Sequence, residues 1–155
     1  MLNWESNKAT TSWGYTVLRV VIGTVFFMHG WQKLTVMGFD GVAGFLGAVG
    51  VPMAGLAAVV VTLVELLGGL ALIVGALTRW ITVPLAATMT VAILTVHLSN
   101  GFFVDQGGME LALTLLAGSL FFLLAGPGMY SLDALWFGRG ERRVLAPQEN
   151  AVGAD

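Results

Sequence analysis

Hydrophobic residues follow one another in four long runs along the chain. The runs cover residues 15–36, 52–76, 80–98 and 109–125. A helix needs about 20 mainly apolar residues to cross a hydrocarbon core of roughly 30 Å, and each run has about this length. Only Leu77-Thr78-Arg79 separates the second run from the third, and so short a connection makes two helices antiparallel neighbours. The pattern predicts an all-α integral membrane protein, an up-and-down bundle of four transmembrane helices within residues 15–136.

The segment between the first two runs has a helical pattern of its own. Glycine recurs there at every third position from 38 to 50. The large apolar residues between these glycines fall at helical spacing; they are Phe39, Val42, Phe45, Leu46 and Val49. A segment with such an apolar face favours a short interfacial helix, lying flat over the outer end of the bundle.

The positions of lysine and arginine predict the orientation of the bundle. With both termini inside, six of the seven basic residues lie on the cytoplasmic side, and only Lys33 lies at the other face. The six are Lys8, Arg19, Arg79, Arg139, Arg142 and Arg143. Residues 1–14 then form a cytoplasmic N-terminal segment, and residues 137–155 form a polar cytoplasmic tail. The expected location is the bacterial cytoplasmic (inner) membrane.

The composition excludes several classes of protein. The chain is 57% hydrophobic and only 10% charged, whereas soluble domains have about 25% charged residues. A net charge of -2 offers no basic surface for nucleic acid. The sequence contains no cysteine, so disulfides, thiolate zinc sites and iron–sulfur clusters are excluded. The lipid bilayer is therefore the expected environment, and any redox chemistry needs a bound cofactor or a partner.

Ionisable side chains within the predicted spans are functional candidates, because each costs several kcal/mol in the membrane. Counting about 1.5 Å per residue from the outer end of each run puts Arg19 and Glu65 at similar depths. This predicts an intramembrane ion pair between them. The alternative is that Arg19 extends to the cytoplasmic headgroups while protonated Glu65 bonds to a backbone carbonyl or to Thr62.

A second group of polar residues lies near the outer surface: His29, Gln32, Lys33, His97 and Glu110. The first three share a helical face, while His97 ends the third run and Glu110 begins the fourth. One interpretation is a Lys33–Glu110 salt bridge with both histidines satisfied at the interface. The other is a pocket for a small, partly polar ligand such as a quinone. The apolar walls of that pocket would come from Phe27, Trp31, Phe102 and Phe103.

The sequence does not favour a metal or haem site. His29 and His97 could be axial ligands of a haem, and together with Glu110 they could hold a divalent ion. No motif with diagnostic spacing accompanies them, and helices one and three are diagonal in the simplest bundle. We therefore assign no catalytic residue and no metal ligand. The cofactor is left open, and a quinone headgroup fits the pocket interpretation.

Several stretches of the chain together resemble the DoxX family of small bacterial membrane proteins. They are His29-Gly30-Trp31-Gln32-Lys33, Gly50-Val51-Pro52, Glu65-Leu66-Leu67-Gly68-Gly69 with Gly75 and Thr78-Arg79, His97-Leu98-Ser99-Asn100-Gly101-Phe102-Phe103, Gly107-Gly108-Met109-Glu110, and Gly126-Pro127-Gly128-Met129-Tyr130-Ser131-Leu132-Asp133. The resemblance implies a four-helix protein of the cytoplasmic membrane with redox partners, because related proteins are linked to a thiosulfate:quinone oxidoreductase and to a complex with superoxide dismutase and a sulfurtransferase. It supplies no catalytic residues.

Three functional hypotheses follow. The first is a membrane subunit of a quinone-linked redox or oxidative-stress complex, which supports an oxidoreductase system more than it acts as an enzyme alone. The second is a small-molecule or proton-coupled transporter that works through Glu65, for which a homo-oligomer or a wet cavity is expected. The third is a structural scaffold in which every charge is paired or anchors a helix.

Overall fold

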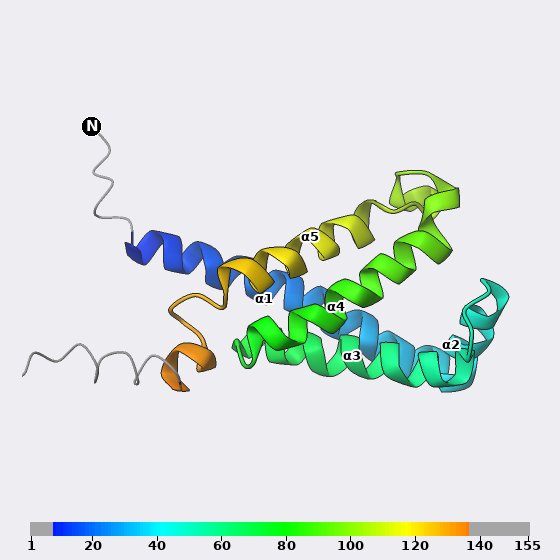
Figure 1. Cartoon of the computed structure of the whole chain (residues 1–155), viewed down its shortest axis with the longest axis horizontal. Helices are drawn as coiled ribbons and strands as arrows, with labels where there is room; N and C mark the ends of the chain where they lie inside the picture. Colours follow the sequence, from blue (N-terminus) through cyan, green and yellow to red (C-terminus); the bar gives the residue numbers. More distant parts are fainter. Residues whose placement is uncertain (1–7, 137–155) are drawn as a thin grey trace, which may run out of the picture.

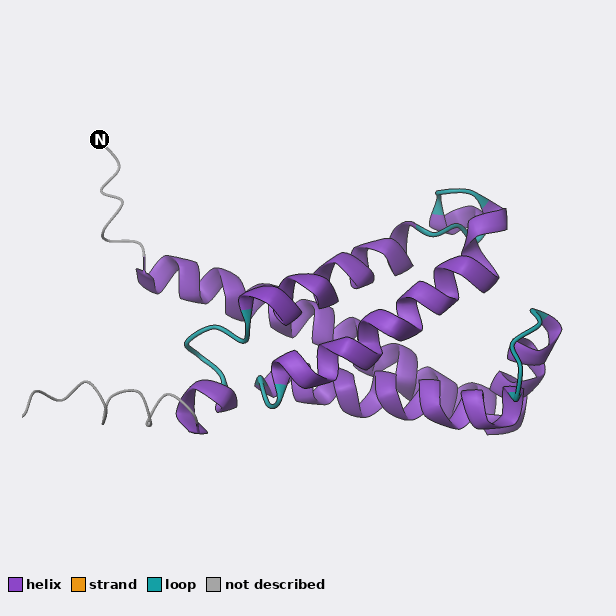
Figure 2. Cartoon of the chain, in the orientation of Figure 1, coloured by secondary structure: helices purple, strands orange, loops and turns teal. Residues whose placement is uncertain are grey.

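The computed structural model describes residues 8–136, and all regular structure in this range is helical. Five α-helices follow one another: α1 (Lys8–Gln32), α2 (Gly38–Ala48), α3 (Ala54–Val74), α4 (Thr78–Ala92) and α5 (Glu110–Ala125) (Figure 1). Figure 2 shows loops between these helices and after α5, where a further short helical segment follows at 132–136. The predicted tail at 137–155 and the first seven residues lie outside the described range.

Three helical stretches are long and apolar enough to cross a membrane. They are Thr10–Ala48, Ala54–Val74 and Thr78–Asn100, and α5 is a shorter apolar helix. The chain is therefore an all-helical protein whose long apolar helices suit a membrane bundle. Four crossings and an interfacial position for α2 stay predictions, although the segment around α2 is helical as its glycine spacing indicated.

Two α-helices continue into a π-helical turn before they end. η2 (Lys33–Met37) follows α1 and leads into α2, and η3 (Ile93–His97) follows α4. Short 3₁₀ turns then cover Leu98–Asn100 and Val104–Gln106. Single π-helical turns often occur at functional sites. In this chain each π-helix contains one of the candidate polar residues, Lys33 or His97.

The helices pack in the order of an up-and-down bundle, α1 on α3, α3 on α4, α4 on α5 and α5 on α1. We call α1, α2 and α3 the first arm and α4 with α5 the second arm. In Figure 1 the arms cross near the middle and diverge toward the end that holds α2 and the loop between α4 and α5. We call this end the outer end, and the end with the α3–α4 turn the inner end.

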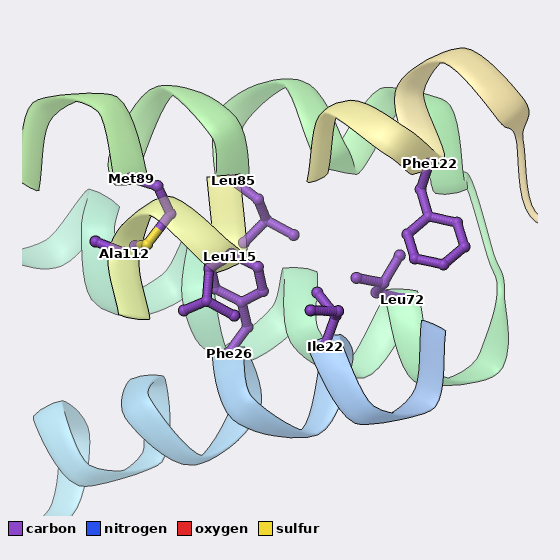
Figure 3. Close-up of a cluster of buried hydrophobic side chains, with 8 residues drawn as sticks. All are labelled: Ile22, Phe26, Leu72, Leu85, Met89, Ala112, Leu115 and Phe122. Carbon is purple, nitrogen blue, oxygen red and sulfur yellow. The ribbon is translucent and has the colours of Figure 1, made fainter. Parts of the chain in front are cut away.

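The hydrophobic core lies where the arms cross. Figure 3 shows its eight buried side chains, which come from α1, α3, α4 and α5: Ile22, Phe26, Leu72, Leu85, Met89, Ala112, Leu115 and Phe122. Phe26, Leu72, Leu85 and Phe122 are completely buried. Because lipid tails are as apolar as these side chains, the contact is stabilised by close packing more than by exclusion of water.

Glycines allow α1 and α3 to approach to backbone contact. A Cβ atom on Gly30 would lie 2.3 Å from the backbone nitrogen of Leu66, and one on Gly69 would lie 2.3 Å from that of Phe27. Gly23 in turn faces the carbonyl oxygen of Gly69. No larger residue fits at these points, so the glycines fix the register of α1 against α3.

Replacement of Gly30 by alanine tests this contact. We expect the substitution to lower the free energy of unfolding by about 1–3 kcal/mol, the usual cost of overpacking. The measurement is thermal unfolding in detergent. Gly14→Ala is the control, because a Cβ there meets no atom within 4 Å and alanine is favoured over glycine inside a helix by about 0.5–1 kcal/mol. Equal midpoints for Gly30→Ala and the unchanged chain would contradict the close approach.

Candidate functional site

A cavity of about 640 Å³ opens between the two arms in the outer half of the molecule. Its walls come from α1, η2, α2 and α3 on one side and from α4, η3, the following loop and α5 on the other. Most of the lining side chains are apolar, and they include Phe26, Met37, Phe45, Met89 and Leu115. The floor is the crossing of the arms, where Phe26, Met89 and Leu115 also belong to the hydrophobic core.

Most of the candidate polar side chains line this cavity. His29, Gln32, Lys33 and His97, which the sequence groups at the outer end, all line it. Glu65 lines it as well, although its predicted depth placed it beside Arg19. A mainly apolar cavity with a few converging polar groups is the usual form of a small-molecule site.

Lys33 and Glu65 form an ion pair across the first arm, between Lys33 Nζ and Glu65 Oε2. The Glu65 side chain is 3% exposed and that of Lys33 is 22% exposed. Two charges so deep in an apolar region are tolerated because each compensates the other, and removal of one partner leaves an uncompensated charge. The pair therefore places a fixed donor and a fixed acceptor at the wall of the cavity.

The predicted Arg19–Glu65 pair does not form. The close contacts put Gly30 beside Leu66, so Lys33 comes level with Glu65 and Arg19 comes level with the inner end of α3. The depth estimate failed because Gly30 lies beside Leu66 and Phe27 lies beside Gly69, so that the start of α3 extends beyond the outer end of α1. The outer ends of the two runs are therefore not at the same height.

Arg19 instead binds the chain that follows α5. Its side chain is 2% exposed, and its two terminal nitrogens donate to the carbonyl oxygens of Pro127 and Tyr130, the latter at 2.6 Å. Backbone carbonyls thus take the place of a carboxylate partner. Neither sequence alternative, the pair with Glu65 or extension to the headgroups, describes this arrangement.

His97 is oriented by the loop between α4 and α5. Its Nδ1 lies 2.7 Å from the carbonyl oxygen of Gly107. Because a carbonyl only accepts hydrogen bonds, Nδ1 carries a proton there. The neutral ring then keeps Nε2 as an acceptor, the one ring nitrogen that it can offer to a ligand.

His29 lies on the same wall as the ion pair. It is four residues before Lys33 on the helix, and it interacts electrostatically with both Lys33 and Glu65. No side-chain hydrogen bond joins His29 to another of the described residues. Its ring is therefore available to a ligand as donor or acceptor.

Glu110 does not line the cavity, contrary to the prediction. Its Oε1 accepts a hydrogen bond of 3.0 Å from the backbone N–H of Val104, so it fixes the loop beside His97. A salt bridge between Glu110 and Lys33 is likewise not formed. Within residues 8–136 no group of three His, Asp or Glu side chains is placed to hold a metal ion.

The predicted aromatic walls also differ from those observed. None of Phe27, Trp31, Phe102 and Phe103 is among the lining residues. Phe27 stacks with Trp31 at 6.3 Å between ring centroids, and Phe102 contacts Phe103 in the loop. The neighbouring Phe26 faces inward instead, because it occupies the face of α1 that packs into the core.

Comparisons with known proteins agree with this architecture. The family model described as DoxX matches residues 14–98. A Bacillus subtilis protein named "Putative oxidoreductase CatD" is 36% identical over 80% of this chain and 87% of its own. "Inner membrane protein YqjF" of Escherichia coli is 33% identical over 79% of this chain and 91% of its own, and an uncharacterized membrane protein of Mycobacterium tuberculosis is 35% identical over 88% and 84%. No solved structure gives a significant match.

The long apolar helices and the relatives define a helical bacterial membrane protein. The chain belongs to the DoxX family, as the motifs around His29, Glu65 and His97 indicated.

A double-mutant cycle tests the partner of Glu65. We expect Lys33→Met alone to lower the free energy of unfolding by about 3–5 kcal/mol, because Glu65 is left as an unpaired buried charge. Adding Glu65→Gln should restore part of this loss. The measurement is reversible unfolding in mixed micelles.

The matched cycle uses Arg19→Met with Glu65→Gln. Arg19 and Glu65 share no contact, so their effects should add to within about 0.5 kcal/mol. Coupling between Arg19 and Glu65, with none between Lys33 and Glu65, would show that the assigned pairing is wrong.

Proposed function

We propose that this DoxX-family protein is a membrane subunit of a quinone-linked redox or oxidative-stress system, and that its outer cavity binds the quinone ring. The convergence of His29, Gln32, Lys33, Glu65 and His97 on one apolar cavity supports the proposal. The relative named as an oxidoreductase is consistent with it. The chain has no cysteine, so the electrons would pass between the ring and a partner protein.

The size and lining of the cavity suit a ring with polar groups at its edge. Small-molecule pockets are commonly about 300–1,000 Å³ and combine apolar walls with a few orienting polar groups. The volume of about 640 Å³ lies in this range. Because the cavity lies between the two arms, we expect a ligand dissolved in the bilayer to enter it from there.

The hydrogen-bonding groups favour the reduced ring over the oxidised one. His97 on the second arm, whose Nδ1 is taken by Gly107, offers Nε2 as an acceptor when its ring is neutral, and Glu65 on the first arm keeps the oxygen that does not pair with Lys33. A quinol donates two O–H groups, whereas the carbonyl oxygens of a quinone only accept. Acceptors on both arms thus match a quinol, while Lys33 and His29 remain as donors for the quinone.

The membrane topology is part of the proposal. Four crossings are proposed, with α5 as the shortest, and both termini lie on the cytoplasmic side. α2 lies at the outer interface, where Phe39 and Phe45, each partly exposed, contact the headgroup region. The inner end with Arg79 then faces the cytoplasm, as the excess of basic residues there indicates.

Binding of a water-soluble quinone analogue tests the ligand. We expect 2,3-dimethoxy-5-methyl-1,4-benzoquinone to bind saturably to the purified chain, and its quinol to bind more tightly under anaerobic conditions. His97→Ala should weaken quinol binding by about tenfold, because one hydrogen bond contributes about 1 kcal/mol and an unpaired ligand group costs more. Isothermal titration calorimetry gives both affinities.

Asp40→Asn is the control for this titration, because Asp40 is an exposed charge outside the cavity lining. Its affinities should equal those of the unchanged chain. No saturable binding of either form, or equal binding by His29→Ala, His97→Ala and the unchanged chain, would refute the quinone site.

Reporter fusions test the topology. Green fluorescent protein folds to its fluorescent form in the cytoplasm and alkaline phosphatase is active only outside it. A C-terminal fluorescent fusion should be bright, and phosphatase inserted at Asp105 should be active. The reverse pattern would overturn the proposed orientation.

A further inference from the structure

A second hollow lies at the inner end, away from the proposed quinone cavity. It is a groove of about 850 Å³ between the start of α1, the start of α4 and the chain that follows α5. In Figure 1 this last segment curls below the inner ends of the helices, near the α3–α4 turn. Its polar lining residues are Thr11, Ser12, Tyr15, Thr78, Arg79 and Asp133.

The one carboxylate in the groove is already fully used. Asp133 Oδ1 accepts the N–H of Leu77 at 2.7 Å, and Oδ2 accepts that of Thr78 at 2.8 Å. Asp133 therefore caps the N-terminus of α4, where Leu77 adopts the left-handed conformation. Its negative charge is stabilised by these amides and by the helix dipole.

Two donors of the groove, in contrast, have unused hydrogen-bonding capacity. Arg79 is exposed, and its one hydrogen bond to a described residue runs from Nη2 to the carbonyl oxygen of Leu124 at 3.3 Å. Thr78 is completely buried, and its hydroxyl has no partner among the described residues. Buried polar groups are nearly always hydrogen-bonded, so an unpartnered hydroxyl at the wall of a groove indicates a site for a ligand atom.

Among the described residues around the groove, positive charges outnumber negative ones. Arg19 lies behind the groove and is held by carbonyls of the segment that lines it. The two guanidinium groups of Arg19 and Arg79 are thus accompanied there by one carboxylate, that of Asp133. An anion bound beside Arg79 would compensate the remaining charge and accept hydrogen bonds from Arg79 and Thr78.

We propose that the groove binds the phosphate group of an anionic phospholipid, with Arg79 as the charged partner and the hydroxyls of Thr78 and Tyr15 as further donors. A lipid is favoured over a free anion because the rim is apolar. Trp80 is 79% exposed and Met129 64% exposed at this rim, positions suited to contact with acyl chains. The inner leaflet, which this end faces in the proposed topology, carries the anionic lipids that attract arginine.

Lipid retention by the purified full chain tests the site. The probe is phosphatidylglycerol, added to protein in neutral detergent and counted by native mass spectrometry. We expect one tightly held lipid, and about a tenfold loss of affinity in Arg79→Gln, which removes a charge-assisted hydrogen bond. Arg79→Lys should restore part of the binding, and Thr78→Val should weaken it with the charge unchanged.

Asp105→Asn is the control, because it changes one exposed charge in the loop at the outer end, away from the groove. Its retention should equal that of the unchanged chain, and phosphatidylcholine should bind more weakly than phosphatidylglycerol. The proposal is overturned if Arg79→Gln retains the lipid as well as the unchanged chain, or if Asp105→Asn loses it equally. It is also overturned if millimolar inorganic phosphate displaces the lipid, since the site would then belong to a free anion.

Discussion

The backbone contact between α1 and α3 is the constraint on which the other features depend. Gly23, Gly30 and Gly69 bring the two helices together without intervening side chains. This contact allows only one register, and that register sets which ionisable residues meet. Lys33 comes to Glu65, and Arg19 comes to the inner end of the bundle, where it donates hydrogen bonds to backbone carbonyl oxygens.

Arg19 of α1 and Lys33 of η2 are compensated by different partners, one at each end of the molecule. At the outer end an ion pair leaves the arms free to diverge, and the cavity forms between them. At the inner end Arg19 holds the chain after α5 through two carbonyl oxygens, while Asp133 caps α4. The arms are thus tied together at one end and open at the other.

Hydropathy predicted the helical membrane architecture. The positions of His29, Gln32, Lys33 and His97 near the outer ends of their hydrophobic runs predicted that these residues lie together. Both predictions rest on apolar length and helical spacing, which depend on local sequence. The partner of Glu65 was not predictable in this way, because it depends on how far α1 is displaced along α3. Gly30 in the first run and Gly69 in the second are the signal that could have indicated the close contact.

Other features depend on contacts between distant segments. Glu110 binds the loop instead of facing the cavity. A carboxylate at the start of a helix lies close to backbone N–H groups, and Glu110 accepts a hydrogen bond from one of them. The roles of Pro127 and Asp133 follow from the return of the chain below the α3–α4 turn. The sequence around Arg19 carries no signal for its hydrogen bond to the carbonyl oxygen of Pro127, which is 108 residues away.

Cysteine labelling tests most directly the central claim, that both arms present their polar and apolar lining to one ligand. The chain has no natural cysteine, so Ala57→Cys and Thr95→Cys, which line the cavity from opposite arms, each give a single reactive site. Leu56→Cys and Leu94→Cys are neighbouring controls at exposed positions outside the lining. A bound quinol analogue should slow maleimide labelling at positions 57 and 95 and leave 56 and 94 unchanged. Protection on one arm alone, or equal protection at all four positions, would contradict a shared cavity.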